Sequence, residues 1–266
     1  MGESIMLIFT DELKQRPVLF LKFANDLQRL ESLQKGNLYM NTLGYFKELE
    51  KKTKEKGMGD KNEGSMILTE LNLKFYKYQT EELVLEGKSS RSEIVIEEDL
   101  QKHVFCFYYL DFGSLEIIEE IEGSVTTLLK FTEEQKEKLI QSFGKYVIII
   151  SCNDFIENVR TAFEKENIEW TTGKVKYSDY TINYTDRIED FIYDRNGKYF
   201  WKDKYFENQK EFRLVVLNRD SDIPIELSVG DLACCSFITD TEKLFNDEYC
   251  IKIGFDPEKD LVKLDD

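Results

Sequence analysis

The chain has 266 residues, 52 acidic and 36 basic side chains, a formal net charge of −16 and a single histidine. This charge opposes binding to a phosphate backbone, because such binding depends on lysine and arginine neutralising the phosphates. One histidine also excludes zinc sites built from several histidines and leaves little room for Ser/His/Asp catalysis. We therefore expect no direct nucleic-acid binding and no metal site.

The cysteine pattern and the hydropathy pattern favour a reduced, cytoplasmic protein. The five cysteines contain no C-x-x-C pair and no disulfide-framework spacing. No basic region precedes the short N-terminal apolar run, so a secretory signal is not expected. The longest apolar run, Val104–Leu110, is far below the roughly 20 residues that cross a bilayer. No membrane association is predicted.

Taken in chain order, the sequence alternates short apolar runs with helical spacings. Strands are predicted at residues 18–23 and 37–41, as two or three within 65–97, and at 103–110, 146–151, 173–177, 211–217 and 223–227. Helices are predicted over 23–33, ended by Lys35-Gly36, over 42–56, over 132–143 with a capping box, and from an Asn153 cap through 163. Residues 57–64 are predicted to form a loop and 87–92 a mobile connection.

These elements predict an α+β fold with a mixed, largely antiparallel sheet core and flanking helices. No internal repeat and no low-complexity linker interrupts the chain, which favours one domain over residues 1–266. A division into two lobes near residues 110–123 is the alternative.

The most informative segment leads through aromatic residues into Q-x-E-F-R. Period-2 alternation places Gln209, Glu211 and Arg213 on one face of a strand. A carboxylate flanked by an amide and a guanidinium is able to polarise a hydroxyl or stabilise a developing cation. The competing interpretation is a surface Glu211–Arg213 pair on an edge strand, which contributes little stability.

Two other features invite a chemical interpretation. The loop GDKNEG, residues 59–64, lacks the spacing of an EF-hand or a P-loop, and a turn is the simpler interpretation. The lone His103 begins an apolar strand without a Ser or Asp partner at a useful spacing. We expect it to make one structural hydrogen bond.

The order of these motifs resembles the bacterial and phage DUF2971-like family. A strand and helix (FLKFANDLQRLESLQKGNLYMNTLGYF) precede the GDKNEG loop, a strand (FCFYYL) follows, and an aromatic approach leads to FENQKEFRLVV. Members of that family carry an N-D-P-x-E-type loop and a late strand with E-Y-R or E-F-R. The resemblance spans most of the chain and itself implies no biochemical activity.

The chain is also similar, more weakly, to the toxin-class ADP-ribosyltransferases, which carry a Q-x-E or E-x-E glutamate on a late strand. This similarity implies NAD as the substrate, with Glu211 binding the nicotinamide ribose and stabilising an oxocarbenium-like transition state. Gln209 would orient the acceptor. The similarity places the cofactor-binding side chains at Lys22 on the first core strand, Tyr108 on the second, Tyr205 and Phe206 on the substrate-facing turn, and Arg213. Lys22 stands where these enzymes have arginine or histidine, and no S-T-S triplet follows at Tyr108.

Two other functions compete with an NAD-using transferase or glycohydrolase. The first is a non-enzymatic, acidic factor that binds a protein partner in host–phage conflict, as an inhibitor or sensor of a defence protein. The second is a magnesium-dependent nuclease or phosphatase using Asp60 and Glu63, which the sequence supports least. The acceptor, the partner and the oligomeric state are not specified by the sequence.

Overall fold

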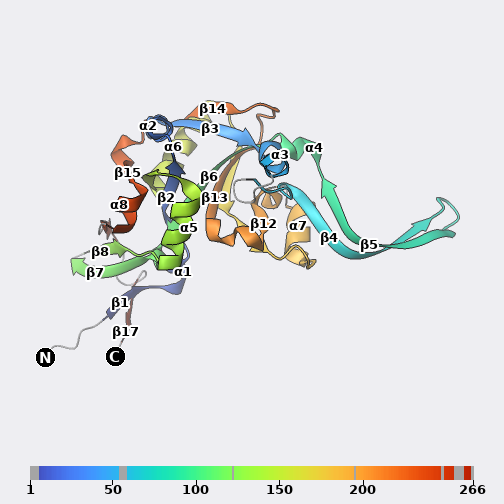
Figure 1. The fold of residues 1–266 in the computed structure, drawn as a ribbon, viewed down its shortest axis with the longest axis horizontal. Helices are drawn as coiled ribbons and strands as arrows, with labels where there is room; N and C mark the ends of the chain where they lie inside the picture. The colour runs from blue at the N-terminus through green and yellow to red at the C-terminus, as the bar shows by residue number, and fades with distance from the viewer. Residues whose placement is uncertain are drawn as a thin grey trace. The chain divides into compact units, whose positions relative to one another are not determined.

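The computed structural model describes residues 6–53, 59–121, 123–194, 196–246, 249–254 and 261–264 (Figure 1). The backbone forms two compact units, each assembled from separate segments of the chain. Unit 1 comprises Met1–Leu38, Phe107–Glu166 and Leu227–Asp266, and unit 2 comprises Tyr39–Cys106 and Asn167–Glu226. The predicted α+β class, with largely antiparallel sheets and flanking helices, is confirmed. The single domain and the division near 110–123 both stay predictions.

Unit 1 is built on antiparallel strands covered by helices. Its strands are β1 (Met6–Phe9), β2 (Pro17–Ala24), β7 (Leu115–Ile121), β8 (Ser124–Leu129), β9 (Tyr146–Ser151), β15 (Ser236–Asp240), β16 (Cys250–Gly254) and β17 (Leu261–Leu264). Its helices are α1 (Asp11–Lys14), α2 (Leu27–Gln34), η1 (Phe112–Ser114), α5 (Glu133–Phe143), α6 (Cys152–Lys165), η4 (Ala233–Cys235) and α8 (Thr241–Asn246). Three further strands, β3 (Asn37–Thr42), β6 (His103–Asp111) and β14 (Ile225–Ser228), have residues in both units.

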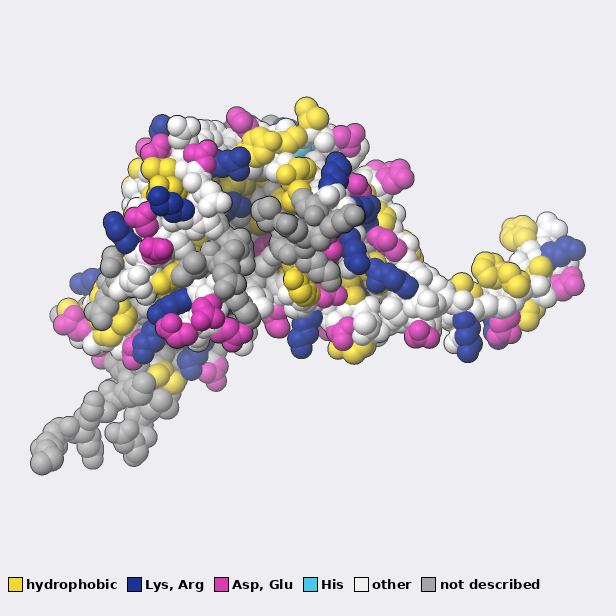
Figure 2. Space-filling model, in the orientation of Figure 1, with side chains coloured by type: hydrophobic (Ala, Val, Ile, Leu, Met, Phe, Trp, Pro, Cys, Tyr) yellow, Lys and Arg dark blue, Asp and Glu magenta, His cyan; other side chains and the backbone are white. Residues whose placement is uncertain are grey.

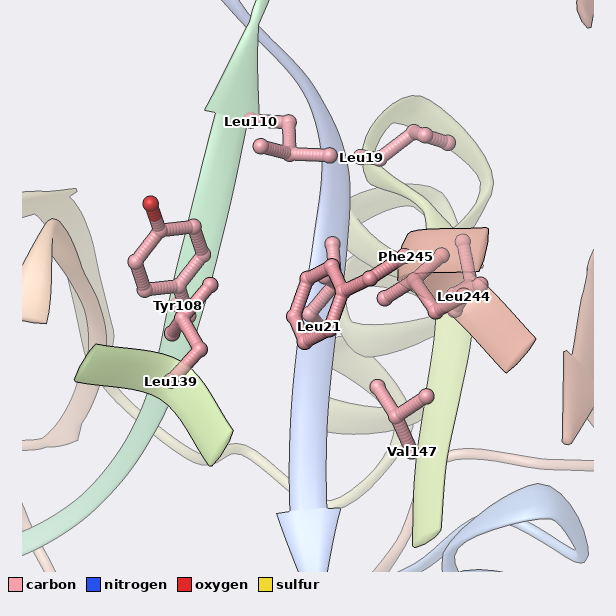
Figure 3. Packing of buried hydrophobic residues seen from close by; sticks show 9 residues of the cluster. Leu19, Leu21, Tyr108, Leu110, Leu139, Val147, Leu244 and Phe245 are labelled. Atoms are coloured by element: carbon pink, nitrogen blue, oxygen red, sulfur yellow. The ribbon is translucent and has the colours of Figure 1, made fainter. Parts of the chain in front are cut away.

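Strand β2 lies at the centre of the main sheet of unit 1. It pairs antiparallel with β6 on one side and with β9 on the other, and β9 pairs with β15. Leu21 of β2 is fully buried and packs in one cluster with Leu110, Leu139 and Val147 (Figure 3). Burying this apolar surface is the main source of stability for the unit.

Unit 2 combines a small sheet with a projecting hairpin. Its strands are β4 (Ser65–Tyr76), β5 (Leu83–Val95), β10 (Trp170–Lys174), β11 (Lys176–Ser178), β12 (Trp201–Asp203) and β13 (Glu211–Val216). Its helices are α3 (Leu43–Thr53), α4 (Glu97–Leu100), α7 (Thr185–Ile192), η2 (Gly197–Phe200) and η3 (Lys204–Gln209). Strand β13 lies between β10 and β6, β11 pairs parallel with β12, and β4 pairs antiparallel with β5.

Three local predictions need correction. Residues 87–92, predicted as a mobile connection, are part of β5, because each pairs with a residue of β4 or continues that ladder. Helix α6 begins after Ser151 and not at Asn153, since the β9 strand leads directly into it. The strand predicted over 173–177 is two strands, β10 and β11.

Candidate functional site

Two motifs that are 150 residues apart in the sequence meet in unit 2. Arg213 donates from Nη1 to Glu63 Oε1 at 2.7 Å and from Nη2 to Glu63 Oε2 at 3.0 Å. Its Nε donates to Glu211 Oε1 at 2.5 Å, so Glu211 and Arg213 do share a face of β13. A two-point arginine–carboxylate contact is both strong and geometrically selective. The GDKNEG loop and the late Q-x-E-F-R segment are therefore parts of one site.

Lys202 of β12 completes this site. Its Nζ donates to Glu211 Oε2 at 2.6 Å and to Gln209 Oε1 at 3.0 Å. Both carboxylate oxygens of Glu211 consequently accept a hydrogen bond from a cation. We call Glu63, Lys202, Gln209, Glu211 and Arg213 the charged cluster.

The charges of this cluster are removed from water. Arg213 is 1% exposed, Glu63 2% and Glu211 5%. Burial alone would raise the pKa of Glu211, but the positive charges of Arg213 and Lys202 outweigh it and hold that pKa well below its usual range. The same carboxylates raise the pKa of Arg213 and of Lys202 against the effect of burial. Glu211, Arg213 and Lys202 are thus kept charged by their partners, which is the condition for tolerating buried charge.

The GDKNEG loop is fixed to helix α3, and this contact positions Glu63. Lys61 N donates to Glu50 Oε2 at 2.8 Å, and Asn62 N donates to Asp60 Oδ1 at 2.9 Å. A Cβ added at Gly59 would lie 2.5 Å from Glu50 N, so this approach of loop to helix requires glycine. The predicted loop is confirmed over residues 59–64, whereas 57 and 58 lie outside the described residues.

Asp60 belongs to the GDKNEG loop, and the sequence suggested it only together with Glu63, for a magnesium-dependent reaction. It is 1% exposed, and its Oδ2 has no hydrogen-bond partner in the structure. Burial, and then the negative charge of Glu63, raise the pKa of Asp60 to about 7, while Lys202 and Arg213 oppose the shift. Asp60 therefore exchanges a proton near neutral pH. The only sign of this site in the sequence is the position of Asp60 directly after Gly59 in the GDKNEG loop.

The structure brings together three of the predicted site residues, Gln209, Glu211 and Arg213. Gln209 does not continue strand β13, as the alternation predicted, because it ends η3 and Lys210 has a φ of +36°. Its side chain still reaches the cluster through Lys202. The alternative of a surface pair on an edge strand is wrong, because β13 is buried and has a neighbour on each side.

The remaining predicted residues lie in different surroundings. Phe206 is buried on η3 with Lys202 Nζ 5.2 Å from its ring centroid, whereas Tyr205 is 57% exposed. Lys22 on β2 and Tyr108 on β6 belong to unit 1. Tyr108 is buried in the apolar cluster of that unit (Figure 3), and burial raises its pKa.

His103 has the structural role that the sequence predicted. It is fully buried at the start of β6, and its Nε2 donates to the carbonyl oxygen of Ile223 at 2.9 Å. One hydrogen bond to a backbone oxygen fixes the ring and its tautomer.

The second feature of unit 2 is the hairpin β4–β5. Every residue from 74 to 86 is exposed, and Figure 1 shows the ribbon running away from the helices of its own unit. We call residues 72–88 the outer arm. Its exposed large apolar side chains are Phe75, Tyr76, Tyr78, Leu83, Val84 and Leu85. Figure 2 shows hydrophobic side chains, in yellow, along this projecting segment. Several large apolar side chains exposed on one segment indicate an interaction surface.

The base of the hairpin is held by polar contacts. Lys47 Nζ of helix α3 donates to Ser65 Oγ at 2.6 Å and to Glu93 Oε1 at 2.5 Å. Arg91 Nη2 donates to Asn62 Oδ1 at 2.8 Å, so the GDKNEG loop contacts β5 as well as Arg213. The loop therefore joins the charged cluster to the base of the arm.

Within the described ranges, no group of three or more His, Cys, Asp or Glu side chains is arranged to hold a metal ion. None of the described helices is long and apolar enough to cross a membrane.

Comparison of the chain with protein-family models, curated proteins and solved structures returns no match. The resemblances to the DUF2971-like family and to ADP-ribosyltransferases therefore stay predictions.

Proposed function

We propose that the chain is a protein-binding factor, that the outer arm is its binding element, and that its partner is a protein of net positive charge. The observation that carries this proposal is the exposure of large apolar side chains on a projecting ribbon. Tyr78 is 90% exposed, Val84 67% and Leu85 58%. Leaving this much apolar surface in water has a free-energy cost, which burial against a partner would recover.

The backbone of the arm supports the same proposal. In the described part of the chain, β4 and β5 pair only with each other, which leaves the outer edge of each strand without a ladder partner. Such edges are templates for an added strand. A partner strand along β5 would gain main-chain hydrogen bonds and would contact the neighbouring apolar side chains.

Charge selects among possible partners. Residues 72–88 contain three acidic and three basic side chains, so the outer arm carries no net charge while the chain as a whole carries −16. A second copy of this chain would approach against that negative field, whereas a basic protein would be attracted to it. A basic partner is therefore favoured over self-association. We propose host–phage conflict as the setting of this binding, which the predicted resemblance to a bacterial and phage family supports.

Site-specific photocrosslinking in the producing cells tests the proposal. We expect a benzophenone amino acid at Tyr78 or Val84 to give one discrete adduct with a protein of pI above about 7. The same group at Tyr193, which is 79% exposed on unit 2 away from the arm sequence, serves as the control. Equal adducts at Tyr193, no adduct from the arm, or an adduct with the chain itself would each contradict the proposal.

A second candidate is NAD-dependent ADP-ribosyl transfer or NAD hydrolysis at Glu211. It is favoured by one contact, the bonding of both Gln209 and Glu211 to Lys202 Nζ, which aligns the Q-x-E pair. Each Glu211 oxygen already accepts a hydrogen bond from a cation, so a ribose hydroxyl would use the remaining acceptor position of one oxygen or displace Lys202 or Arg213.

Nicotinamide release from NAD separates this candidate from the first. It predicts release by the wild-type protein, loss of release in Glu211→Gln, and no change in the exposed control Glu226→Gln. Failure of the wild-type protein to release nicotinamide or to show a thermal shift with NAD would reject it, whether or not the Glu211 variant folds.

A further inference from the structure

Unit 1 carries two adjacent cysteines that neither the charged cluster nor the outer arm uses. Cys234 and Cys235 are the last two residues of the short helix η4, and neither is in a disulfide. Cys234 is exposed and Cys235 is half-buried. The two side chains are in hydrogen-bond contact with each other. The pair is therefore a vicinal dithiol, and a ligand reaches it from solvent through Cys234.

The surrounding backbone holds this pair in place. Cys235 donates to the carbonyl oxygen of Leu232 twice, from N at 3.0 Å and from Sγ at 3.4 Å. Leu232 is fully buried, and its own N donates to the carbonyl oxygen of Gln34 at the end of helix α2 at 2.8 Å. Ala233 N donates to Asp231 Oδ1 at 2.9 Å. A ligand that joins both sulfurs would bind a largely preformed site, which lowers the entropy cost of binding.

Two sulfur atoms in contact suit a soft ion that needs few ligands. Cysteine sulfur selects soft ions, whereas a structural zinc ion takes four protein ligands. In the part of the chain that the structure describes, no third His, Cys, Asp or Glu side chain joins Cys234 and Cys235 in a group that could hold a metal ion. Trivalent arsenic that carries one organic group forms two further bonds to sulfur, so a dithiol completes its coordination.

The protonation of the thiols favours the same ligand. Burial, and then the charges of Cys234 and Asp154, raise the pKa of Cys235 to about 11. A metal that binds thiolates would have to displace this proton near pH 7. An arsenoxide, R–As=O, reacts with two neutral thiols: two As–S bonds form, the As=O bond breaks, and the oxygen leaves as water with both thiol protons. Arsenic stays trivalent, so the reaction needs no oxidant or reductant.

We propose that Cys234 and Cys235 form a binding site for trivalent arsenic, which the two sulfur atoms hold as a chelate. This site lies in unit 1 and does not depend on the outer arm or on the proposed protein partner. Inorganic arsenite and organic arsenoxides share this chemistry.

Native mass spectrometry of the reduced full chain tests the site with phenylarsine oxide and with arsenite. We expect one phenylarsine oxide to bind per chain with loss of one water. Excess 2,3-dimercaptopropanol, which is itself a dithiol, should remove the arsenical, and 2-mercaptoethanol should not. Tighter binding of phenylarsine oxide than of arsenite would assign the site to an organic arsenoxide, and the reverse would assign it to the inorganic ion.

Single cysteine variants locate the site. Cys234→Ser and Cys235→Ser should each bind phenylarsine oxide about a hundredfold more weakly, because the second As–S bond is no longer formed within one molecule. Cys234→Ser should keep the wild-type melting temperature, since this side chain is exposed. Cys250→Ser, at an exposed position of β16, is the matched control and should bind like the wild type.

Four results would overturn the site: no adduct on the wild-type chain, release of the adduct by 2-mercaptoethanol, unchanged binding by Cys234→Ser, or an equal loss in Cys250→Ser. If Cys235→Ser fails to fold, Cys234→Ser decides the question.

Discussion

Replacing Asp60 by asparagine should make the stability of unit 2 less dependent on pH. The native pKa of Asp60 is about 7 against an ordinary value of 3.8, because burial and Glu63 disfavour its charge. The native state therefore holds this proton more tightly than the unfolded chain does. Its stabilising contribution is complete below about pH 4 and is lost as the pH rises through about 7. Asparagine keeps an Oδ1 acceptor for Asn62 N and has no proton to lose.

The size of the stability difference between Asp60→Asn and wild type follows from the pKa shift of Asp60. About three pKa units correspond to about 4 kcal/mol once Asp60 is ionised in both states. Linkage gives a stability advantage for Asp60→Asn of about 2 kcal/mol at pH 5.5 and about 4 kcal/mol at pH 8, on top of any pH-independent difference. The advantage should therefore widen by about 2 kcal/mol over this range.

Urea unfolding followed by tryptophan fluorescence measures the stability difference between Asp60→Asn and wild type in unit 2, where Asp60 lies. The two tryptophans, Trp170 and Trp201, both belong to unit 2. Asp186→Asn, at an exposed position of α7, is the control and should give a difference that does not widen with pH. A constant gap between Asp60→Asn and wild type from pH 5.5 to pH 8 would refute the assignment of a protonated Asp60.

Two further predictions concern stability. Glu211→Gln should destabilise unit 2 by about 3–5 kcal/mol at pH 7, because it leaves two buried cations short of an anion. The exposed control Glu226→Gln should stay within about 0.5 kcal/mol of wild type. Equal urea midpoints for the two variants would contradict the stabilising role of Glu211 in the charged cluster. Gly36→Ala should cost at least about 2 kcal/mol, since Gly36 has a φ of +89° and an added Cβ would lie 1.9 Å from Gly230 O. Gly87→Ala, where an added Cβ meets nothing within 4 Å, should leave the melting temperature nearly unchanged, and a similar loss in both glycine variants would show the reasoning to be wrong.

Local signals explain which elements the sequence predicted well. The apolar runs of β2, β6 and β9 and the capping box of α5 depend on neighbouring residues only. The pairing of Glu211 with Arg213 on one face also follows from strand periodicity. Burial of that face did not follow, because a strand of alternating charged and apolar residues normally turns its charges to water. Contacts of Arg213 with Glu63, far away in the sequence, and of Glu211 with Lys202 make the charged face an interior one.

In the outer arm, the sequence pattern fails in the opposite direction, because apolar residues are exposed where charged residues of β13 are buried. The run Leu83-Val84-Leu85 has the composition of a buried strand, yet all three residues are exposed. Periodicity and composition report that a segment is apolar, and they do not report whether another part of the same chain covers it. Gln209 illustrates a third limit, because the left-handed conformation of Lys210 breaks the alternation without a glycine to signal it.

The outer arm is proposed to bind a basic protein. The most direct measurement is the affinity of the purified wild-type chain for the crosslinked partner, compared with a variant carrying Tyr78→Ser, Val84→Ser and Leu85→Ser. Because each removed side chain is largely exposed in the free chain, the variant should keep the wild-type melting temperature. If each of the three side chains contributes about 1–2 kcal/mol on burial against the partner, the dissociation constant of the variant should rise at least a hundredfold. Raising the salt concentration should weaken the binding of the partner to the wild type and to the variant. Equal affinities for wild type and variant would contradict the claim.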